Sequence, residues 1–489
     1  MSDVKSETAD EKMNSSLLSG ERLIGAVKGS LIGRAKTVHD ISFTSVVTDS
    51  RAVVPGSLFV PLIGENQDGH RYIPQGLEKG ASVVFVCRAN FEKEPDAYKK
   101  MAAEHASVAF VCVENTLHAL QDAASAYVEK FPRLIACAVT GSSGKTTTKE
   151  IAVAVLSQKY RVVSNRGNLN SETGLPLSVF EIRAEHEVGL FEMGMNRRNE
   201  IGEIAAVLKP NYGIVTNIGT AHIGILGSRR AIAEEKKKIF NYVDEQGLAV
   251  IPAADDFADF LSEGVRGKVV RYGKDLPESG VVFIRDAGLE GTVFSVDGVE
   301  MQLHLPGAYN FSNALAAVAL SRALGLTPEE IKAGIESVRP IGARSHLIKD
   351  RLNILEDCYN ANPDSMAKAV EFCTDLQVSG KKIFVLGDML ELGEEAENAH
   401  AEIGALLAQS DVDKVILIGE QMKAACKSAG KIASKIEYIA SHDDEAIRNV
   451  AEIIRSFASD GDFVLLKASN GIGLNRLVPL LCEAGGAGK

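Results

Sequence analysis

Short apolar runs alternate with helix-like polar segments along most of the 489-residue chain. From residue 134 onward, the runs LIACAVT, VGLFEM and GIVTNIG are continuous, and helical spacing follows them, for example over 145–159 and 198–207. Strands that read as unbroken apolar runs are typical of parallel sheets that are covered by helices on both faces. The pattern therefore predicts an α/β fold with a mostly parallel central sheet.

The same pattern divides the chain into regions. The C-terminal third repeats it in KKIFVLGDM, DKVILIGE and DFVLLKAS, with helices expected over 396–409 and 443–457, which predicts a doubly wound, Rossmann-like unit. Residues 23–130 contain shorter strands with turn signals, typical of a small α/β domain. Prolines at 132 and 340 mark joints. We expect three domains, over 21–132, 133–342 and 343–489, after a flexible extension of residues 1–20.

Charge and composition narrow the class of protein. Acidic residues outnumber basic ones, 65 to 53, and no basic block is present, which argues against binding of nucleic acid or anionic membranes. No apolar run approaches the roughly 20 residues of a membrane-spanning helix, and the polar start does not resemble a secretory signal. The seven cysteines form no Cys-x-x-Cys pair. We therefore expect a cytoplasmic protein without membrane insertion.

The most specific motif is VTGSSGKTTTKE, residues 139–150, between a predicted strand and a predicted helix. In that context, the backbone N–H groups of a glycine-rich loop bind phosphates. Lys145 would contact the β and γ phosphates, and the Thr146 hydroxyl would bind Mg²⁺. Valine stands at position 139, so the loop is a shortened G-x-x-G-K-T form. The alternative is a plain helix start with lysine in its first turn, but the coincidence of glycine, lysine and hydroxyl favours a triphosphate site.

Two further polar residues follow predicted strands. Glu192 ends VGLFEM and His222 follows GIVTNIGTA, so both are expected at the carboxyl edge of the sheet, where ligands bind in such folds. Taken alone, each is more often an ordinary surface carboxylate or loop histidine. Because Glu192, His222 and Thr146 are all expected at the same edge of the sheet, we expect a site for one or two Mg²⁺ ions there.

Other polar clusters are less specific. Lys236-Lys237-Lys238 is typical of a solvated helix face. The asparagines of 165–170 could donate to a phosphate or sugar, although they are also common turn residues. Arg344, at the second joint, could reach a transferring phosphoryl group. The glycines at 471 and 473 follow the last strand and lack a third glycine, so they do not indicate a dinucleotide site.

Longer strings resemble a known family. TGSSGKTTTKE, FEMGMNRRNEIGEI, TNIGTAHIG, AEEKKKIF and LPGAYNFSNALAA resemble the Mur ligase superfamily, and the early DSR and DGH strings are similar to its UDP-sugar-binding domain. LEDCYNANPDSM and VLGDMLELGEEAENAH resemble the member that adds D-alanyl-D-alanine to UDP-N-acetylmuramoyl-tripeptide. The resemblance covers about residues 47–477.

The resemblance implies an ATP-dependent amide ligase of peptidoglycan precursor synthesis that works through an acyl phosphate. It implies a UDP-binding domain, a central ATPase domain and a C-terminal Rossmann-like domain, and we expect a monomer. Matching positions would bind ATP (Gly141, Ser142, Ser143, Gly144, Lys145, Thr146, Thr147, Asn310, Asp357), Mg²⁺ (Thr146, Glu192, His222, and Lys236 if carbamylated) and the UDP substrate (Ser50, Arg51, Asn168, Asn170). Lys145, His222 and Arg344 would be catalytic.

Two departures from the family pattern bear on this interpretation. Gly224 stands where the family often has an acidic residue, and Lys467-Ala468-Ser469-Asn470 replaces Lys-Gly-Ser-Arg, which leaves the dipeptide contacts open. Alternatives are a ligase for a single amino acid, similar to MurE or folylpolyglutamate synthetase, or a non-catalytic ATP-binding switch. The general base for the amine and the third residue of the acceptor peptide, diaminopimelate or lysine, also stay open.

Overall fold

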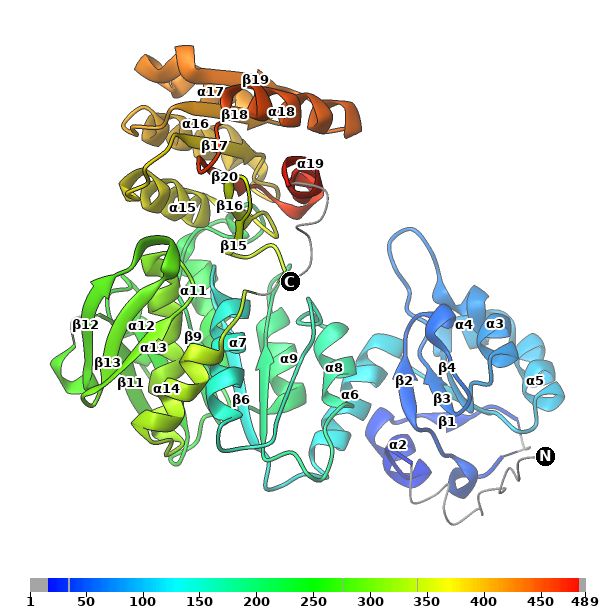
Figure 1. The fold of residues 1–489 in the computed structure, drawn as a ribbon. Coiled ribbons are helices and arrows are strands. Elements are labelled where there is room, and N and C mark those ends of the chain that lie inside the picture. The colour runs from blue at the N-terminus through cyan, green and yellow to red at the C-terminus, as the bar shows by residue number, and fades with distance from the viewer. Residues whose placement is uncertain (1–15, 34–35, 275, 341, 483–489) are drawn as a thin grey trace, which may run out of the picture. The chain divides into compact units, whose positions relative to one another are not determined.

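The computed structural model describes residues 16–33, 36–274, 276–340 and 342–482 (Figure 1). They form two compact units: unit 1 contains the chain up to residue 136 with 163–195 and 200–210, and unit 2 contains 137–162, 196–199 and the chain from 211 onward. Most of the expected extension of residues 1–20, namely 1–15, lies outside the described residues. Leu17 and Leu18 are buried.

The N-terminal part of unit 1 is a five-stranded sheet in the order β1-β5-β4-β3-β2. Only β1 is antiparallel to its neighbour. The strands are β1 (Ser30–Leu31), β2 (Ser45–Val47), β3 (Ser57–Phe59), β4 (Val83–Cys87) and β5 (Ala109–Val113), and the helices are α2 (Gly20–Val27), α3 (Ile73–Glu78), α4 (Arg88–Lys93), α5 (Pro95–Glu104) and α6 (Thr116–Val128). The central strands β4 and β5 are buried along their whole length, as expected for continuous apolar runs.

The later segments of unit 1 and the first half of unit 2 form the middle of the chain. Unit 1 contributes α8 (Gly174–Val179), β8 (Val188–Glu192) and α9 (Glu200–Leu208), and β7 (Val162–Ser164) lies at the boundary between the units. In unit 2, parallel pairing gives the order β11-β10-β9-β6. These strands are β6 (Ile135–Thr140), β9 (Tyr212–Val215), β10 (Leu248–Pro252) and β11 (Lys268–Tyr272).

Helices pack around this parallel sheet, and a small antiparallel sheet follows it. The helices are α7 (Lys145–Leu156), α10 (Ile223–Leu226), α11 (Arg229–Lys237), α12 (Ala258–Ser262), α13 (Ala308–Ala323) and α14 (Pro328–Ser337). The antiparallel sheet contains β12 (Val281–Asp286), β13 (Thr292–Val296) and β14 (Val299–Leu303). Both α13 and α14 contact α7, so the helix that follows the phosphate-loop motif is fixed from two sides.

The C-terminal part of unit 2 is a six-stranded sheet in the order β15-β16-β20-β17-β18-β19. Its strands are β15 (His346–Lys349), β16 (Asn353–Asp357), β17 (Lys382–Gly387), β18 (Lys414–Ile418), β19 (Ile436–Ile439) and β20 (Phe463–Lys467), and its helices are α15 (Pro363–Asp375), α16 (Ala396–Leu407), α17 (Met422–Ser428), α18 (Asp444–Phe457) and α19 (Val478–Leu481). All pairs except β15 with β16 are parallel. Separate apolar clusters line the two faces, which confirms the doubly wound prediction.

Predicted and observed helices agree closely. The helix expected over 145–159 is α7 (Lys145–Leu156), and the one expected over 443–457 is α18 (Asp444–Phe457). Among the described residues, no helix is both long enough and apolar enough to cross a membrane. The α/β prediction is confirmed.

Helices α16 and α17 pack closely at Gly404, and a substitution there tests this contact. A Cβ atom at Gly404 would lie 2.2 Å from the carbonyl oxygen of Ala425. We expect Gly404→Ala to lower the free energy of unfolding by about 1–3 kcal/mol, because the helices must separate to admit the methyl group. Gly25→Ala in α2 is the control: its Cβ meets nothing within 4 Å, so it should be neutral or stabilise by up to about 1 kcal/mol. Denaturant unfolding of both variants measures the difference, and equal stabilities would contradict the packing argument.

Candidate active site

The loop between β6 and α7 depends on two glycines. Gly144 has φ +77°, a left-handed conformation that glycine adopts without strain, and a Cβ atom there would lie 2.3 Å from Oδ1 of Asn313. A Cβ atom at Gly141 would lie 1.7 Å from Oγ1 of Thr216. Both positions therefore exclude side chains, which accounts for the two glycines of the motif.

Side chains from the end of β9 hold this loop in shape. The amide N–H of Ser143 donates to Oδ1 of Asn217 at 3.1 Å, and Oγ1 of Thr216 donates to the Ser143 carbonyl at 2.6 Å. Because β9 runs parallel to β6, the segments that follow both strands emerge at the same edge of the sheet. Sequence reasoning missed Asn217, although a polar residue directly after a buried strand was the available signal.

Two lysines converge on one carbonyl oxygen in this loop. Nζ of Lys145 donates to the Gly141 carbonyl at 3.0 Å, and Nζ of Lys236, from α11, donates to the same oxygen at 2.8 Å. The Lys236 residue is only 1% exposed. Two ammonium groups and a helix N-terminus therefore concentrate positive charge at one strand end, which favours binding of a polyphosphate.

The lysine run of α11 is not a uniform solvated face. Lys236 points to the phosphate loop, Lys237 donates to the Phe260 carbonyl at 2.6 Å, and Lys238 pairs with Glu235 at 2.7 Å. The expectation of a solvated face is wrong for Lys236, because its place on α11 brings its ammonium group to the buried Gly141 carbonyl.

His222 precedes α10 with φ +65°, an uncommon conformation for a residue with a side chain. Its Nδ1 is buried without a hydrogen-bond partner, and a carboxylate oxygen of Glu391 lies 3.6 Å from it. Burial, with smaller contributions from the charges of Lys145 and Lys236, lowers the pKa of His222 to about 3. The imidazole is therefore neutral at ordinary pH and keeps one unprotonated nitrogen that can bind a cation.

Glu192 ends β8 in unit 1 and is 2% exposed. Asn165 binds its backbone twice: Oδ1 accepts from the Glu192 N–H at 2.9 Å, and Nδ2 donates to the Glu192 carbonyl at 3.0 Å. Asn170 donates to Oε1 of Glu192 at 2.6 Å. The 165–170 loop thus orients this carboxylate, whereas Asn168 is exposed.

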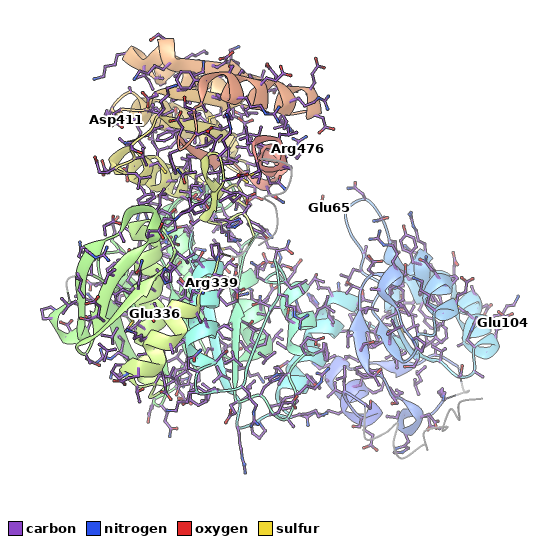
Figure 2. All side chains as sticks on the ribbon, viewed as in Figure 1. Glu65, Glu104, Glu336, Arg339, Asp411 and Arg476 are labelled. Carbon is purple, nitrogen blue, oxygen red and sulfur yellow. The ribbon has the colours of Figure 1, made fainter. Side chains whose placement is uncertain are left out.

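A pocket beside the phosphate loop brings Arg344 together with the start of α7. It is lined by Thr146, Thr147, Glu150, Leu305, Val338, Arg339, Pro340 and Arg344. The Arg339 side chain is labelled in Figure 2. The Arg344 guanidinium lies over the Tyr359 ring at 3.8 Å, which steadies it without using its hydrogen-bond donors.

Asn310 and Asp357 already have partners in the structure. Asn310 is buried, its Nδ2 donates to the Pro306 carbonyl at 2.8 Å, and Asn313 donates to its Oδ1 at 3.3 Å. Asn313 is the side chain that closely approaches Gly144, so the pair lies directly behind the loop. Sequence reasoning missed Asn313, although Asn310 and Asn313 are spaced to share one helix face.

The Asp357 carboxylate forms a nearly buried ion pair. Its Oδ2 accepts from Nζ of Lys467 at 2.6 Å, and its Oδ1 accepts from the Ser345 N–H at 3.2 Å. Lys467, the first residue of the string that departs from the family pattern, therefore ties the end of β20 to the end of β16.

Ser50 and Arg51 lie in one short turn of unit 1 but differ in exposure. Ser50 is buried and donates to Oε1 of Gln75 at 2.5 Å. Arg51 is exposed and pairs with Asp49 at 2.6 Å. Hydrogen bonds from Arg51 lower the pKa of Asp49 to about 2. The guanidinium is thus held at the surface, where an anionic ligand can reach it.

A metal ion bound to this chain would need ligands from substrate or water in addition to protein side chains. Within the described ranges, no three His, Cys, Asp or Glu side chains gather where they could hold a metal ion. Mg²⁺, however, is commonly held by one or two protein ligands together with substrate phosphates and waters. In unit 2, His222 has an imidazole nitrogen without a hydrogen-bond partner, and in unit 1, Glu192 has an oriented carboxylate; each by itself is a group that can bind a cation.

Comparisons with known proteins agree with this geometry. Family models match residues 42–128 ("Mur ligase family, catalytic domain"), 139–321 ("Mur ligase middle domain") and 343–470 ("Mur ligase, glutamate ligase domain"). These three separate matches support the predicted three-domain organisation.

Relatives with the same printed name extend over nearly the whole chain. The UDP-N-acetylmuramoyl-tripeptide–D-alanyl-D-alanine ligase of Treponema pallidum is 43% identical over 95% of this chain and 99% of its own, and that of Bacillus subtilis is 35% identical over 90% and 93%. A crystal structure of MurF from Acinetobacter baumannii superimposes with a TM-score of 0.83 at 29% identity, covering 95% of this chain and 98% of that one. MurF of Thermotoga maritima in complex with ADP gives 0.74 at 27%, covering 89% and 96%. By sequence, by domain order and by fold, the chain belongs to the Mur ligase family.

Proposed function

We propose that the protein is an ATP-dependent ligase that joins D-alanyl-D-alanine to UDP-N-acetylmuramoyl-tripeptide in peptidoglycan precursor synthesis. The observation that carries the proposal is the glycine-rich loop after a parallel strand, where Lys145 begins a helix and the buried Lys236 side chain reaches the Gly141 carbonyl. This loop lies in a chain that resembles the UDP-N-acetylmuramoyl-tripeptide–D-alanyl-D-alanine ligase of Treponema pallidum over 95% of its length. The loop supports the phosphoryl chemistry, and the relatives support the two substrates.

The reaction needs positioned cations rather than a protein nucleophile. The tripeptide carboxylate attacks the γ-phosphorus of ATP, releasing ADP and forming an acyl phosphate. The dipeptide amine then attacks the acyl carbon, loses a proton, and displaces inorganic phosphate as the amide forms. Both steps develop negative charge on phosphoryl or carbonyl oxygens, which fixed ammonium, guanidinium and backbone N–H groups stabilise.

The nucleotide would lie along the loop of Gly141, Ser142, Ser143, Gly144, Lys145, Thr146 and Thr147. Lys145 would release the Gly141 carbonyl and bind the β and γ phosphates, while Arg344 would approach the transferring group from the adjacent pocket. The apolar wall of that pocket, Leu305, Val338 and Pro340, suits the nucleoside. Asn310 supports the loop through Asn313. The Asp357 carboxylate, whose oxygens accept from Lys467 and from the Ser345 N–H, would accept a ribose hydroxyl as a further donor.

We assign Mg²⁺ to Thr146, Glu192, His222 and a carbamylated Lys236. The ion would neutralise charge on the phosphate oxygens. The Lys236 ammonium group would lose one proton, and the resulting amine would add CO₂ to give a carbamate and release a second proton, which converts a buried cation into an oxygen ligand. Its near-complete burial favours the exchange, because an ammonium group is costly to keep charged away from water.

The UDP end of the acceptor is assigned to Ser50, Arg51, Asn168 and Asn170. The exposed Arg51 guanidinium would pair with the diphosphate. Because Asn170 also orients Glu192, its substitution would affect the metal site as well as the substrate site. All of these residues come from one chain, so a monomer can carry the reaction. ATP use and seven free cysteine thiols favour the cytoplasm.

Lys145→Ala tests the phosphoryl-transfer assignment. We expect turnover to fall by about 10³-fold or more while the thermal midpoint changes little, because the ammonium group serves the transferring phosphate and not the core. Phosphate release in the presence of both substrates gives the rate, and circular dichroism gives the midpoint. Near-normal turnover would remove the ATP site from this loop.

Lys236→Ala tests the metal assignment, and Lys237→Ala is its neighbouring control. Removing Lys236 should lower the rate at least about ten-fold and raise the Mg²⁺ concentration for half-maximal rate, because the ion then has one ligand fewer. Lys237→Ala should leave the Mg²⁺ titration unchanged, since that side chain bonds to Phe260. Intact-mass analysis in bicarbonate should show one added CO₂ in the wild type and none in Lys236→Ala. Equal Mg²⁺ titrations for the two variants would reject the role of Lys236.

Specificity for the amine separates this ligase from relatives that add one amino acid. D-alanyl-D-alanine should support ligation far better than D-alanine, L-lysine, diaminopimelate or L-glutamate, with one ADP and one phosphate per amide. A site built to pair with a dipeptide leaves buried polar groups unsatisfied with a shorter amine, at a cost of about 1–3 kcal/mol per missing partner. Mass analysis of products made with each amine, and with lysine- or diaminopimelate-containing acceptors, decides the point. Equal use of a single amino acid would exclude the dipeptide assignment.

A further inference from the structure

The short segment that carries His222 is bound on one side by a single aspartate. Oδ2 of Asp364 accepts the Thr220 N–H at 2.8 Å and the Thr220 hydroxyl at 2.9 Å. Gly219 packs against the same carboxylate, because a Cβ atom there would lie 2.2 Å from Oδ2. Asp364 belongs to α15, more than 140 residues away along the chain but in the same compact unit.

The other side of the segment meets a second part of the C-terminal sheet region. A Cβ atom at Gly224 would lie 3.0 Å from the carbonyl of Leu392, and the Glu391 carboxylate lies 3.6 Å from Nδ1 of His222. This close approach also explains why glycine stands where the family often has an acidic residue. The segment around His222 is thus contacted at two places, both by residues after the second joint.

The start of α15 also reaches the phosphate loop. Asn362, its N-terminal cap, places Nδ2 3.4 Å from the Ser142 carbonyl, and Oγ of Ser142 accepts the Gly219 N–H at 2.9 Å. One helix end therefore contacts both the phosphate loop and the His222 segment. Charge-assisted hydrogen bonds such as the pair on Asp364 are stronger than neutral ones and define geometry more sharply.

We propose that Asp364 is a positioning residue for the ligation reaction, which holds the 219–224 segment so that His222 keeps its left-handed backbone conformation at the phosphate loop. A residue other than glycine keeps a φ of +65° only where the surrounding structure holds its backbone in that conformation. Asp364 accepts two hydrogen bonds from Thr220, which lies two residues before His222. The change in kcat that this inference predicts rests on the proposed function, whereas the change in hydrogen exchange that it predicts does not.

A merely structural role for Asp364 is the competing explanation, since acidic residues in a first helical turn stabilise the helix. Asp444 is the matched control, because it lies in the first turn of α18, behind an aspartate cap, and pairs with Arg476. Helix stabilisation predicts equal effects for Asp364→Asn and Asp444→Asn. Positioning predicts that only the first variant changes the His222 segment.

The experiment compares Asp364→Asn, Thr220→Val, Thr220→Ser and Asp444→Asn in the full-length protein. We expect kcat to fall about ten-fold or more in Asp364→Asn and Thr220→Val, with smaller changes in KM, because the segment is displaced while the groups that bind the substrates remain. Thr220→Ser keeps the hydroxyl and should stay within about two-fold of wild type, as should Asp444→Asn. The double variant Asp364→Asn/Thr220→Val should fall no further than the worse single variant.

Hydrogen exchange supplies the second readout. Amides of 219–224 should exchange faster in Asp364→Asn than in wild type or Asp444→Asn, because the Thr220 N–H loses its charged acceptor. Unchanged kcat and unchanged exchange in both Asp364→Asn and Thr220→Val would overturn the inference. If Asp364→Asn does not fold, the comparison of Thr220→Val with Thr220→Ser decides it. Failure of the wild type to ligate would instead reject the proposed function, and the exchange measurement would still test the role of Asp364.

Discussion

The carbonyl oxygen of Gly141 accepts hydrogen bonds from the side chains of Lys145 and Lys236, and the arrangement of the phosphate loop depends on these two contacts. Glycines at 141 and 144 are required, because side chains there would collide with Thr216 and Asn313. The same crowding keeps the loop rigid, so charge is stabilised without reorganisation when a phosphoryl group is transferred. The pocket that contains Arg344 extends the site along the first turn of α7.

Residues that are far apart in the sequence complete this loop, and each has a structural partner that orients it. Lys236 comes from α11, Asn217 and Thr216 from the end of β9, and Asn313 from α13. In unit 1, Asn165 and Asn170 orient the Glu192 carboxylate in the same manner. Much of the polar sequence around the motifs therefore positions other functional groups instead of touching a ligand itself.

The fold could be predicted further than the site. Continuous apolar runs predicted the parallel strands, and the Gly-Lys-Thr string predicted the strand, loop and helix around Lys145, because these signals are local. The partners of Asp357 and Asn310, and the burial of Lys236, could not be predicted, since they depend on which residues a distant strand or helix presents. Local charge density even indicated a solvated face for Lys236-Lys237-Lys238, whereas each lysine has its own acceptor.

The sequence by itself determined the α/β class, the three-part organisation, the phosphate loop and the family. The fold class and organisation follow from the local hydrophobic periodicity, and the phosphate loop and the family follow from short sequence motifs. Only the tertiary structure decided that His222 is neutral and largely buried, that Asp364 binds Thr220 two residues before it, and that Glu391 lies close to its imidazole. The physical reason is that burial, close approach and the pairing of charges are properties of segments brought together by folding, and no short stretch of sequence contains them.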